Sequence, residues 1–204
     1  MSVTYLVAKD ANRLTINYKA TTDKATPVNL TNHMYLNLGG AGNKTVLKHA
    51  LRVNADKYTP TDDTLIPTGK IDAVEGTPLD FRKGVRIGKR IESLTETAAL
   101  GYDHNYVLNA KKSDQKLAFA AMLKDPESGR FVRISTTEPG IQFYSGNFLK
   151  GQKGKGGKTY AHRSACCLET QHFPDSVNQK TFPSTILKPG DEFKSMTQYT
   201  FFAE

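Results

Sequence analysis

Cysteine is scarce in this chain of 204 residues, which contains only Cys166 and Cys167. Neighbouring residues of an extended chain point to opposite faces, so an ordinary disulfide between these two is not expected. Two cysteines also provide neither a disulfide framework nor the ligand spacing of a zinc site. The composition therefore argues against a disulfide-rich secreted scaffold and suits a reducing compartment.

Long apolar runs and targeting signals are also missing. No stretch approaches the roughly 18 apolar residues of a membrane-spanning helix. The opening residues MSVTYLVAKD lack the basic-then-apolar order of a signal peptide, and the closing FFAE is not a peroxisomal address. We expect a cytoplasmic protein with no membrane partner.

Acidic residues are outnumbered, with 20 Asp and Glu against 28 Lys and Arg, which gives a net charge of +8. Such a balance can indicate nucleic-acid or other anion binding. The basic residues are scattered, however, and their one concentration, KGQKGKGGK at residues 150–158, is glycine-rich and typical of a loop. No nucleic-acid partner is expected, and an anion-binding basic domain is kept only as a minor alternative.

Helical patterns are rare, whereas short alternating segments are frequent. Residues 3–8 and 14–21 flank the turn sequence KDAN and predict a hairpin. Residues 86–99 form the only candidate helix, on the loose spacing of Ile87, Ile91 and Leu94. Other predicted strands cover residues 46–53, 106–109, 117–123, 130–136, 141–144, 164–169, 182–187 and 193–202. The pattern predicts an all-β fold, a large antiparallel β-sandwich that forms a single domain over residues 1–204.

Residues 27–38, PVNLTNHMYLNL, have two unlike faces when written as a strand. One face is apolar apart from Asn32. The other carries hydrogen-bonding groups around a central imidazole: Asn29, Thr31, His33, Tyr35 and Asn37. Such a row resembles the wall of a polar pocket, although a half-exposed strand with a satisfied histidine explains the alternation equally well.

Glu169 is the most pointed of the other candidates. It ends an apolar strand and has no Lys or Arg beside it in sequence. Partial desolvation should raise the pKa of its carboxyl above the reference of about 4.3 and make it a better base, while leaving it largely ionised at pH 7. A glutamate closing a strand at the rim is the alternative.

Asp103, His104, Gln142, His172 and Asp175 also combine polar chemistry with apolar or Gly and Pro neighbours. Each has an ordinary reading as a turn or strand residue. A set of His, Asp and Glu residues invites a metal as well. No two of them share a recognised ligand spacing such as H-x-x-x-H, so we expect neither a metal nor a cofactor.

Four strings together resemble the aldose 1-epimerases, or galactose mutarotases: PVNLTNHMYLNL, GYDHNYVLN, EPGIQFYSGNFL and CLETQHFPDSVNQKTFPSTILKPGDEF. They run through essentially the whole chain in the family's order. The resemblance implies a galactose mutarotase-like supersandwich of antiparallel strands. It also implies the interconversion of the α and β anomers of free aldohexoses such as galactose and glucose, without a cofactor.

The resemblance also implies roles for particular residues. His33 of the NLTNH string is the general acid, and Glu169 of the LETQ string is the general base. Asp103 of the GYDH string holds sugar hydroxyls, while Gln142 and Tyr35 line the pocket. In that chemistry Glu169 takes the proton of the anomeric hydroxyl as His33 protonates the ring oxygen.

The chain departs from the family pattern at its front. Members carry a further N-terminal section, which supplies an arginine and a second histidine to the sugar, and nothing in residues 1–32 stands in for them. The chain thus resembles the C-terminal portion of a mutarotase, apparently without the N-terminal strands. We expect a monomer that acts as a mutarotase. The alternative is a non-catalytic carbohydrate-binding module derived from a truncated mutarotase.

Overall fold

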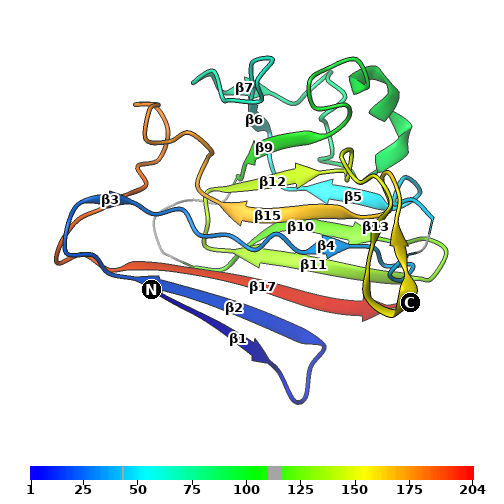
Figure 1. Ribbon diagram of the computed structural model, residues 1–204, viewed down its shortest axis with the longest axis horizontal. Coiled ribbons are helices and arrows are strands. Elements are labelled where there is room, and N and C mark those ends of the chain that lie inside the picture. Colours follow the sequence, from blue (N-terminus) through cyan, green and yellow to red (C-terminus); the bar gives the residue numbers. More distant parts are fainter. Residues whose placement is uncertain (43, 110–115) are drawn as a thin grey trace.

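Two antiparallel sheets dominate the computed structural model, which describes residues 1–42, 44–109 and 116–204 (Figure 1). The larger sheet has seven strands in the order β1 (Ser2–Val7), β2 (Arg13–Ala20), β17 (Phe193–Ala203), β11 (Arg130–Thr136), β10 (Ala118–Lys124), β5 (Ala50–Val53) and β8 (Val85–Arg86). The second has six strands in the order β4 (Tyr35–Leu36), β15 (Cys166–Gln171), β12 (Gly140–Tyr144), β9 (Asp103–Val107), β6 (Lys57–Thr59) and β7 (Asp72–Ala73).

Short elements complete the described chain. Two small ribbons pair β13 (Gln152–Lys153) with β14 (Thr159–Tyr160), and β16 (Ile186–Leu187) with β3 (Thr26–Pro27). The helical elements within the described residues are single 3₁₀ turns: η1 (Ile87–Lys89), η2 (Ile91–Leu94) and η4 (Lys155–Gly157). The predicted all-β antiparallel architecture is confirmed, and so is the hairpin at the front of the chain.

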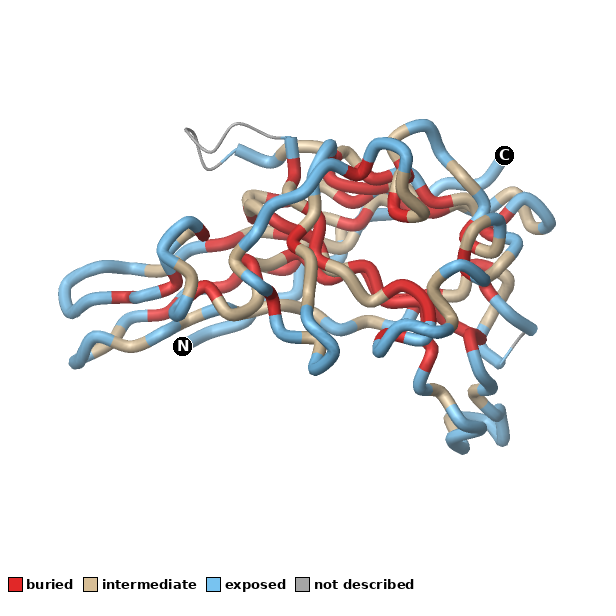
Figure 2. The backbone as a smooth tube through the Cα atoms, turned by 90° about the horizontal axis from the view of Figure 1, so that it is seen from above, coloured by how far each residue is buried: buried red, intermediate tan, exposed pale blue. Residues whose placement is uncertain are grey.

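The hydrophobic core lies between the two sheets, and Figure 2 shows the buried residues gathered in the interior of the molecule. From the six-stranded sheet, Phe143 and Leu168 point inward, and from the seven-stranded sheet Ile16 and Ile134 meet them. Side chains alternate along a strand, so the residues beside Phe143 and Leu168 must point to the outer face. The inward apolar residues of β12 and β15 therefore fix which polar residues emerge on the other side.

A chain of buried hydroxyls crosses the core between the sheets. Thr170 of β15 shares a hydrogen bond with Thr197 of β17 at 2.5 Å, and Thr197 shares another with Thr136 of β11 at 3.2 Å. All three residues are almost completely buried. Because buried polar groups are costly unless paired, this arrangement links β15 firmly to the opposite sheet.

The helix predicted over residues 86–99 is wrong: this stretch forms β8 and the two 3₁₀ turns η1 and η2. The N–H groups of Ile87 and Gly88 donate to the carbonyls of His49 and Leu47, which are far along the chain, instead of to a preceding turn. The Ser93 hydroxyl donates to the Arg90 carbonyl and competes with the backbone. Tertiary pairing and side-chain competition thus replace a regular helix.

The continuous strand predicted over residues 27–38 is also wrong, because only β3 and β4 at its two ends are paired as strands. The alternation itself is retained: Val28, Leu30 and Met34 are partly buried, whereas His33 and Tyr35 are exposed. The intervening segment runs beside β15 (Figure 1). The reason that it lacks a backbone ladder lies in its polar side chains, described below.

Candidate active site

The outer face of the six-stranded sheet gathers all five of the site residues that the sequence predicts. Across β12 and β15, Gln142 lies opposite Glu169. Across β12 and β9, Tyr144 lies opposite Asp103. Across β15 and β4, Cys167 lies opposite Tyr35. Since residues two apart on a strand share a face, four neighbouring strands bring these groups together from distant parts of the sequence.

His33 and Glu169 form the centre of this face. His33 Nε2 lies 3.4 Å from Glu169 Oε1, although the residues are 136 positions apart. The imidazole is half exposed, with 51% of its side-chain surface accessible, whereas the carboxylate retains only 9%. A solvent-facing imidazole thus covers a largely buried carboxylate on the outer face of the sheet.

The buried position of Glu169 changes its acidity. Burial raises the pKa of its carboxyl to about 7; the facing His33 opposes the shift, and Asp103 adds to it. The direction agrees with the prediction from sequence. A carboxylate with such a pKa is well suited to exchange protons at neutral pH.

Asp103 and Gln142 form a second polar pair on the same face. Gln142 Nε2 donates to Asp103 Oδ1 at 2.8 Å. Burial raises the pKa of Asp103, while the bond from Gln142 and the nearby His33 lower it. The buried Oε1 of Gln142 has no hydrogen-bond partner among the residues that the structure describes. A buried acceptor without a partner is uncommon in a folded protein and marks Gln142 as a position that needs an explanation beyond packing.

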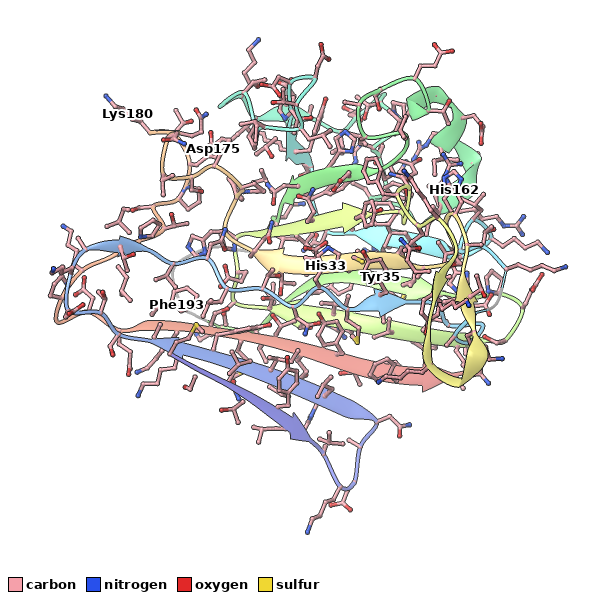
Figure 3. The ribbon with its side chains drawn as sticks, viewed as in Figure 1. His33, Tyr35, His162, Asp175, Lys180 and Phe193 are labelled. Atoms are coloured by element: carbon pink, nitrogen blue, oxygen red, sulfur yellow. The ribbon has the colours of Figure 1, made fainter. Side chains whose placement is uncertain are left out.

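Aromatic rings surround His33. Its ring centroid lies 5.1 Å from that of Tyr35 and 6.4 Å from that of Tyr144, and the two tyrosines are 6.3 Å apart. Figure 3 shows His33 and Tyr35 close together over the sheet. Sequence reasoning did not assign Tyr144 to the site, although its position two residues after Gln142 on a strand is a sufficient signal. Aromatic faces with a few convergent polar groups are typical of small-ligand sites.

Polar side chains anchor the segment that carries His33. Asn29 makes two bonds to the backbone of His172: its Nδ2 donates to the carbonyl at 2.9 Å, and its Oδ1 accepts from the N–H at 3.0 Å. Thr31 Oγ1 donates to the Thr170 carbonyl at 3.0 Å, and Asn37 Nδ2 donates to the Ser164 carbonyl at 2.8 Å. We call Asn29, Thr31 and Asn37 the side-chain clamp.

The side-chain clamp explains why residues 28–34 have no strand ladder. Side chains lie between this segment and β15, so the two backbones are bridged instead of paired directly. The polar row predicted from sequence is therefore divided between two tasks. Three of its members hold the segment, and His33 and Tyr35 are left exposed on the outer face.

Other polar candidates lie elsewhere. His104 points to the opposite side of β9 from Asp103; its Nδ1 accepts the Asp103 N–H at 3.0 Å, and burial lowers its pKa to about 4. His172 pairs with Glu138, with Nδ1 and Oε2 2.6 Å apart. Asp175 lies in a loop well away from His33 and Tyr35, as does His162 (Figure 3). The structure therefore does not place these residues in the site.

A cavity of about 460 Å³ opens beside the site and shares Tyr35 with it. Its walls include Asn37, Gln152 and Tyr160, so the β13–β14 ribbon forms one side.

As possible metal ligands, one group stands out among the described residues: donor atoms of His33, Cys167 and Glu169 all lie within 4.8 Å of one another.

Comparison with known proteins identifies the class. The family described as aldose 1-epimerase matches residues 1–200. The chain belongs to the aldose 1-epimerase family, which confirms the resemblance drawn from the sequence motifs.

The part of the chain that the structure describes contains no helix with the length and hydropathy of a membrane span.

Relatives in this family include a galactose mutarotase from Rattus norvegicus, 46% identical over 98% of this chain and 56% of the relative. An aldose 1-epimerase from Escherichia coli is 39% identical over 96% of this chain and 56% of its own. The solved aldose epimerase homologue from C. elegans superimposes with a TM-score of 0.88 at 35% identity, over 98% of this chain and 59% of that one. The chain thus spans somewhat more than half the length of these relatives.

Proposed function

We propose that this protein interconverts the α and β anomers of free aldohexoses, galactose and glucose among them. One observation carries the proposal: the imidazole of His33 and the carboxylate of Glu169 lie 3.4 Å apart. The anomeric hydroxyl and the ring oxygen of a pyranose are bonded to the same carbon. An acid and a base that serve these two oxygens together must therefore lie close to each other.

The reaction follows from the two proton transfers. Glu169 takes the proton of the anomeric hydroxyl while His33 gives a proton to the ring oxygen, and the bond from C1 to the ring oxygen breaks. The open-chain aldehyde rotates about its C1–C2 bond. The ring oxygen then attacks the other face of the aldehyde, with the proton roles reversed, and the opposite anomer forms.

The remaining polar and aromatic residues suit the substrate. Asp103 and Gln142, which are hydrogen-bonded to each other, provide polar groups for sugar hydroxyls, and Tyr35 presents a half-exposed ring beside His33. These groups fix how the sugar lies over the acid and base. Several relatives are galactose mutarotases, which supports galactose as a substrate.

The test follows anomeric exchange by polarimetry with freshly dissolved α-galactose and α-glucose. We expect Glu169→Gln and His33→Asn each to lower kcat by about 10²–10⁴-fold. Glu96→Gln and His162→Asn make the same chemical changes at exposed positions outside the site and should leave the rate unchanged. A wild-type rate no higher than that of Glu169→Gln would overturn the proposal, and sugar binding without exchange would instead identify a carbohydrate-binding module.

We also propose that the protein acts as a cytoplasmic monomer. Cys166 and Cys167 are both unpaired and buried, which suits a reducing compartment. Light scattering coupled to size exclusion tests the oligomeric state; a dimer mass at micromolar concentration would contradict the monomer.

A further inference from the structure

Three metal-ligating side chains converge on the outer face of the six-stranded sheet. Cys167 and Glu169 lie two residues apart on β15 and share that face, while His33 approaches from the clamped segment beside it. One donor atom from each lies within 4.8 Å of the others. The conclusion from sequence that no metal-ligand spacing exists considered H-x-x-x-H and similar spacings, which suit a helix. It overlooked the i, i+2 spacing that a strand provides.

The separations are close to those of a tetrahedral zinc site. Bonds of about 2.0–2.3 Å from Zn²⁺ to N, O and S place neighbouring ligand atoms roughly 3.3–3.7 Å apart. His33 Nε2 and Glu169 Oε1 are already 3.4 Å apart. The remaining separations, at most 4.8 Å, need to shorten by only about 1 Å. The half-exposed His33 side chain can shorten its separation from Cys167 because its solvent side is open, whereas the separation between Cys167 and Glu169 depends on two side chains of the same strand.

The chemistry of the donors selects the kind of ion. A thiolate and an imidazole favour Zn²⁺ and similar soft or borderline cations, whereas Mg²⁺ and Ca²⁺ prefer oxygen ligands. Three protein ligands leave a fourth position for water. Cys166, the adjacent residue, points into the core from the opposite face and cannot contribute.

The geometry points to a binding site for a thiophilic divalent cation of the Zn²⁺ type, formed by His33, Cys167 and Glu169. On binding, the ion replaces the thiol proton of Cys167, which is released to solvent, and forms a metal–sulfur bond. The ion occupies the space between His33 and Glu169 and prevents both from exchanging protons with a sugar. It is therefore a reversible inhibitor, a consequence that depends on the proposed mutarotase function, whereas the binding itself does not.

Co²⁺ is the probe of choice, since a cobalt–thiolate bond gives an intense near-ultraviolet charge-transfer absorption. We expect this band to appear when Co²⁺ is added to the wild-type protein under reducing conditions, and Zn²⁺ to displace it. Cys167→Ser should abolish the band and weaken Zn²⁺ binding by roughly 100-fold or more, because the thiolate is the strongest of the three donors. Cys166→Ser, the matched control on the opposite face, should keep the band.

Activity provides the second measurement. Zn²⁺ should slow anomeric exchange by the wild-type protein but not by Cys167→Ser, and Mg²⁺ at the same concentration should slow neither. Thermal unfolding of Cys167→Ser and of a second variant, Cys167→Ala, checks that the fold is intact. Absence of the band in the wild type, or its persistence in both folded Cys167 variants, would overturn the metal site.

The two proposals fail separately. A charge-transfer band in a protein without anomeric exchange would leave the metal site standing and overturn the proposed function. Anomeric exchange without the band, and without inhibition by Zn²⁺, would do the reverse.

Discussion

The outer face of β15 and the edge strand β1 show two opposite uses of a sheet. On β15, polar and charged groups are buried: Glu169 retains 7% of its surface. On β1 all six residues are exposed, including Tyr5 and Leu6, which are each more than half accessible. Tyr5 pairs with Ile16, which is fully buried, so the core ends between β1 and β2.

This difference shows that burial by neighbouring segments, more than residue type, determines the acid–base properties of a side chain in this molecule. The clamped segment and the neighbouring strands cover Glu169, and the burial raises the pKa of its carboxyl to about 7. Among the described residues no strand pairs with the outer edge of β1. Its apolar side chains therefore contribute little burial and leave an exposed patch at that edge. Four changes test this contrast.

The largest effect is expected from Phe143→Ala. Phe143 is fully buried, and its ring lies 5.5 Å from that of Phe81 and 5.2 Å from that of Tyr102. Loss of the ring should lower the free energy of unfolding by about 3–5 kcal/mol. The control, Val3→Ala on β1, should change it by less than about 0.5 kcal/mol. Chemical denaturation measures both, and similar losses at the two positions would contradict the contrast.

The pH dependence of stability gives the next effect. Burial lowers the pKa of His104 from 6.5 to about 4, so its protonation is less favourable in the folded state than in the unfolded state. The preference for neutral His104 contributes stability that is fully present above pH 6.5 and is lost as the pH falls to about 4. The loss amounts to about 3 kcal/mol.

His104→Gln, which does not titrate, should lack this contribution, and denaturation of both proteins between pH 4 and 7.5 measures the difference. Glu169 acts with the opposite sign in the same window, because its raised pKa favours the folded state at low pH. Taking the difference between wild type and variant removes that contribution. Parallel stability curves for the two proteins would contradict the role of His104.

The third effect concerns activity. Because Glu169 must be ionised to act as a base, kcat/KM should fall about tenfold per pH unit below pH 7. Asp103→Asn removes a negative charge that raises the pKa of Glu169, so the fall should begin at a lower pH. Polarimetry across pH 5 to 8 measures both profiles. An unchanged profile in a variant that still binds sugar would exclude this electrostatic coupling.

The smallest effect is expected at the side-chain clamp. Asn29→Ala removes both bonds to the His172 backbone, which loosens the segment before His33. We expect kcat to fall about tenfold, equivalent to about 1.4 kcal/mol, with KM much less affected. Asn12→Ala, at the exposed turn between β1 and β2, is the matched control and should have the wild-type kcat. A wild-type kcat in Asn29→Ala would show that the clamp does not position His33.

Much of the fold could be predicted because the two faces of a strand produce an alternation of apolar and polar residues in the sequence. The alternation of residues 14–21 and 130–136 located β2 and β11 closely. Residues 57–59 lie outside every strand predicted from the sequence but form β6, since three residues between turns carry too little periodicity. The helix predicted over residues 86–99 was wrong because apolar spacing alone does not show that Ile87 and Gly88 pair with a distant segment.

Part of the candidate site could be predicted through the motif resemblance, which named His33, Glu169, Asp103, Gln142 and Tyr35. All five share one sheet face, while their assigned roles remain predictions. The side-chain clamp could not be predicted, because the partners of Asn29 and Thr31 are backbone groups some 140 residues away. Cys167 was discounted together with Cys166, although their opposite faces give them different surroundings.

Thr170 lies next to Glu169 and is held from two directions. Its carbonyl accepts a hydrogen bond from the Thr31 hydroxyl of the outer segment. Its own hydroxyl shares a hydrogen bond with the hydroxyl of Thr197 on the opposite sheet. The carboxylate cannot drift without disturbing both attachments, so local loosening around it requires the two layers to separate. Heat inactivation of the protein should consequently coincide with its cooperative melting rather than precede it.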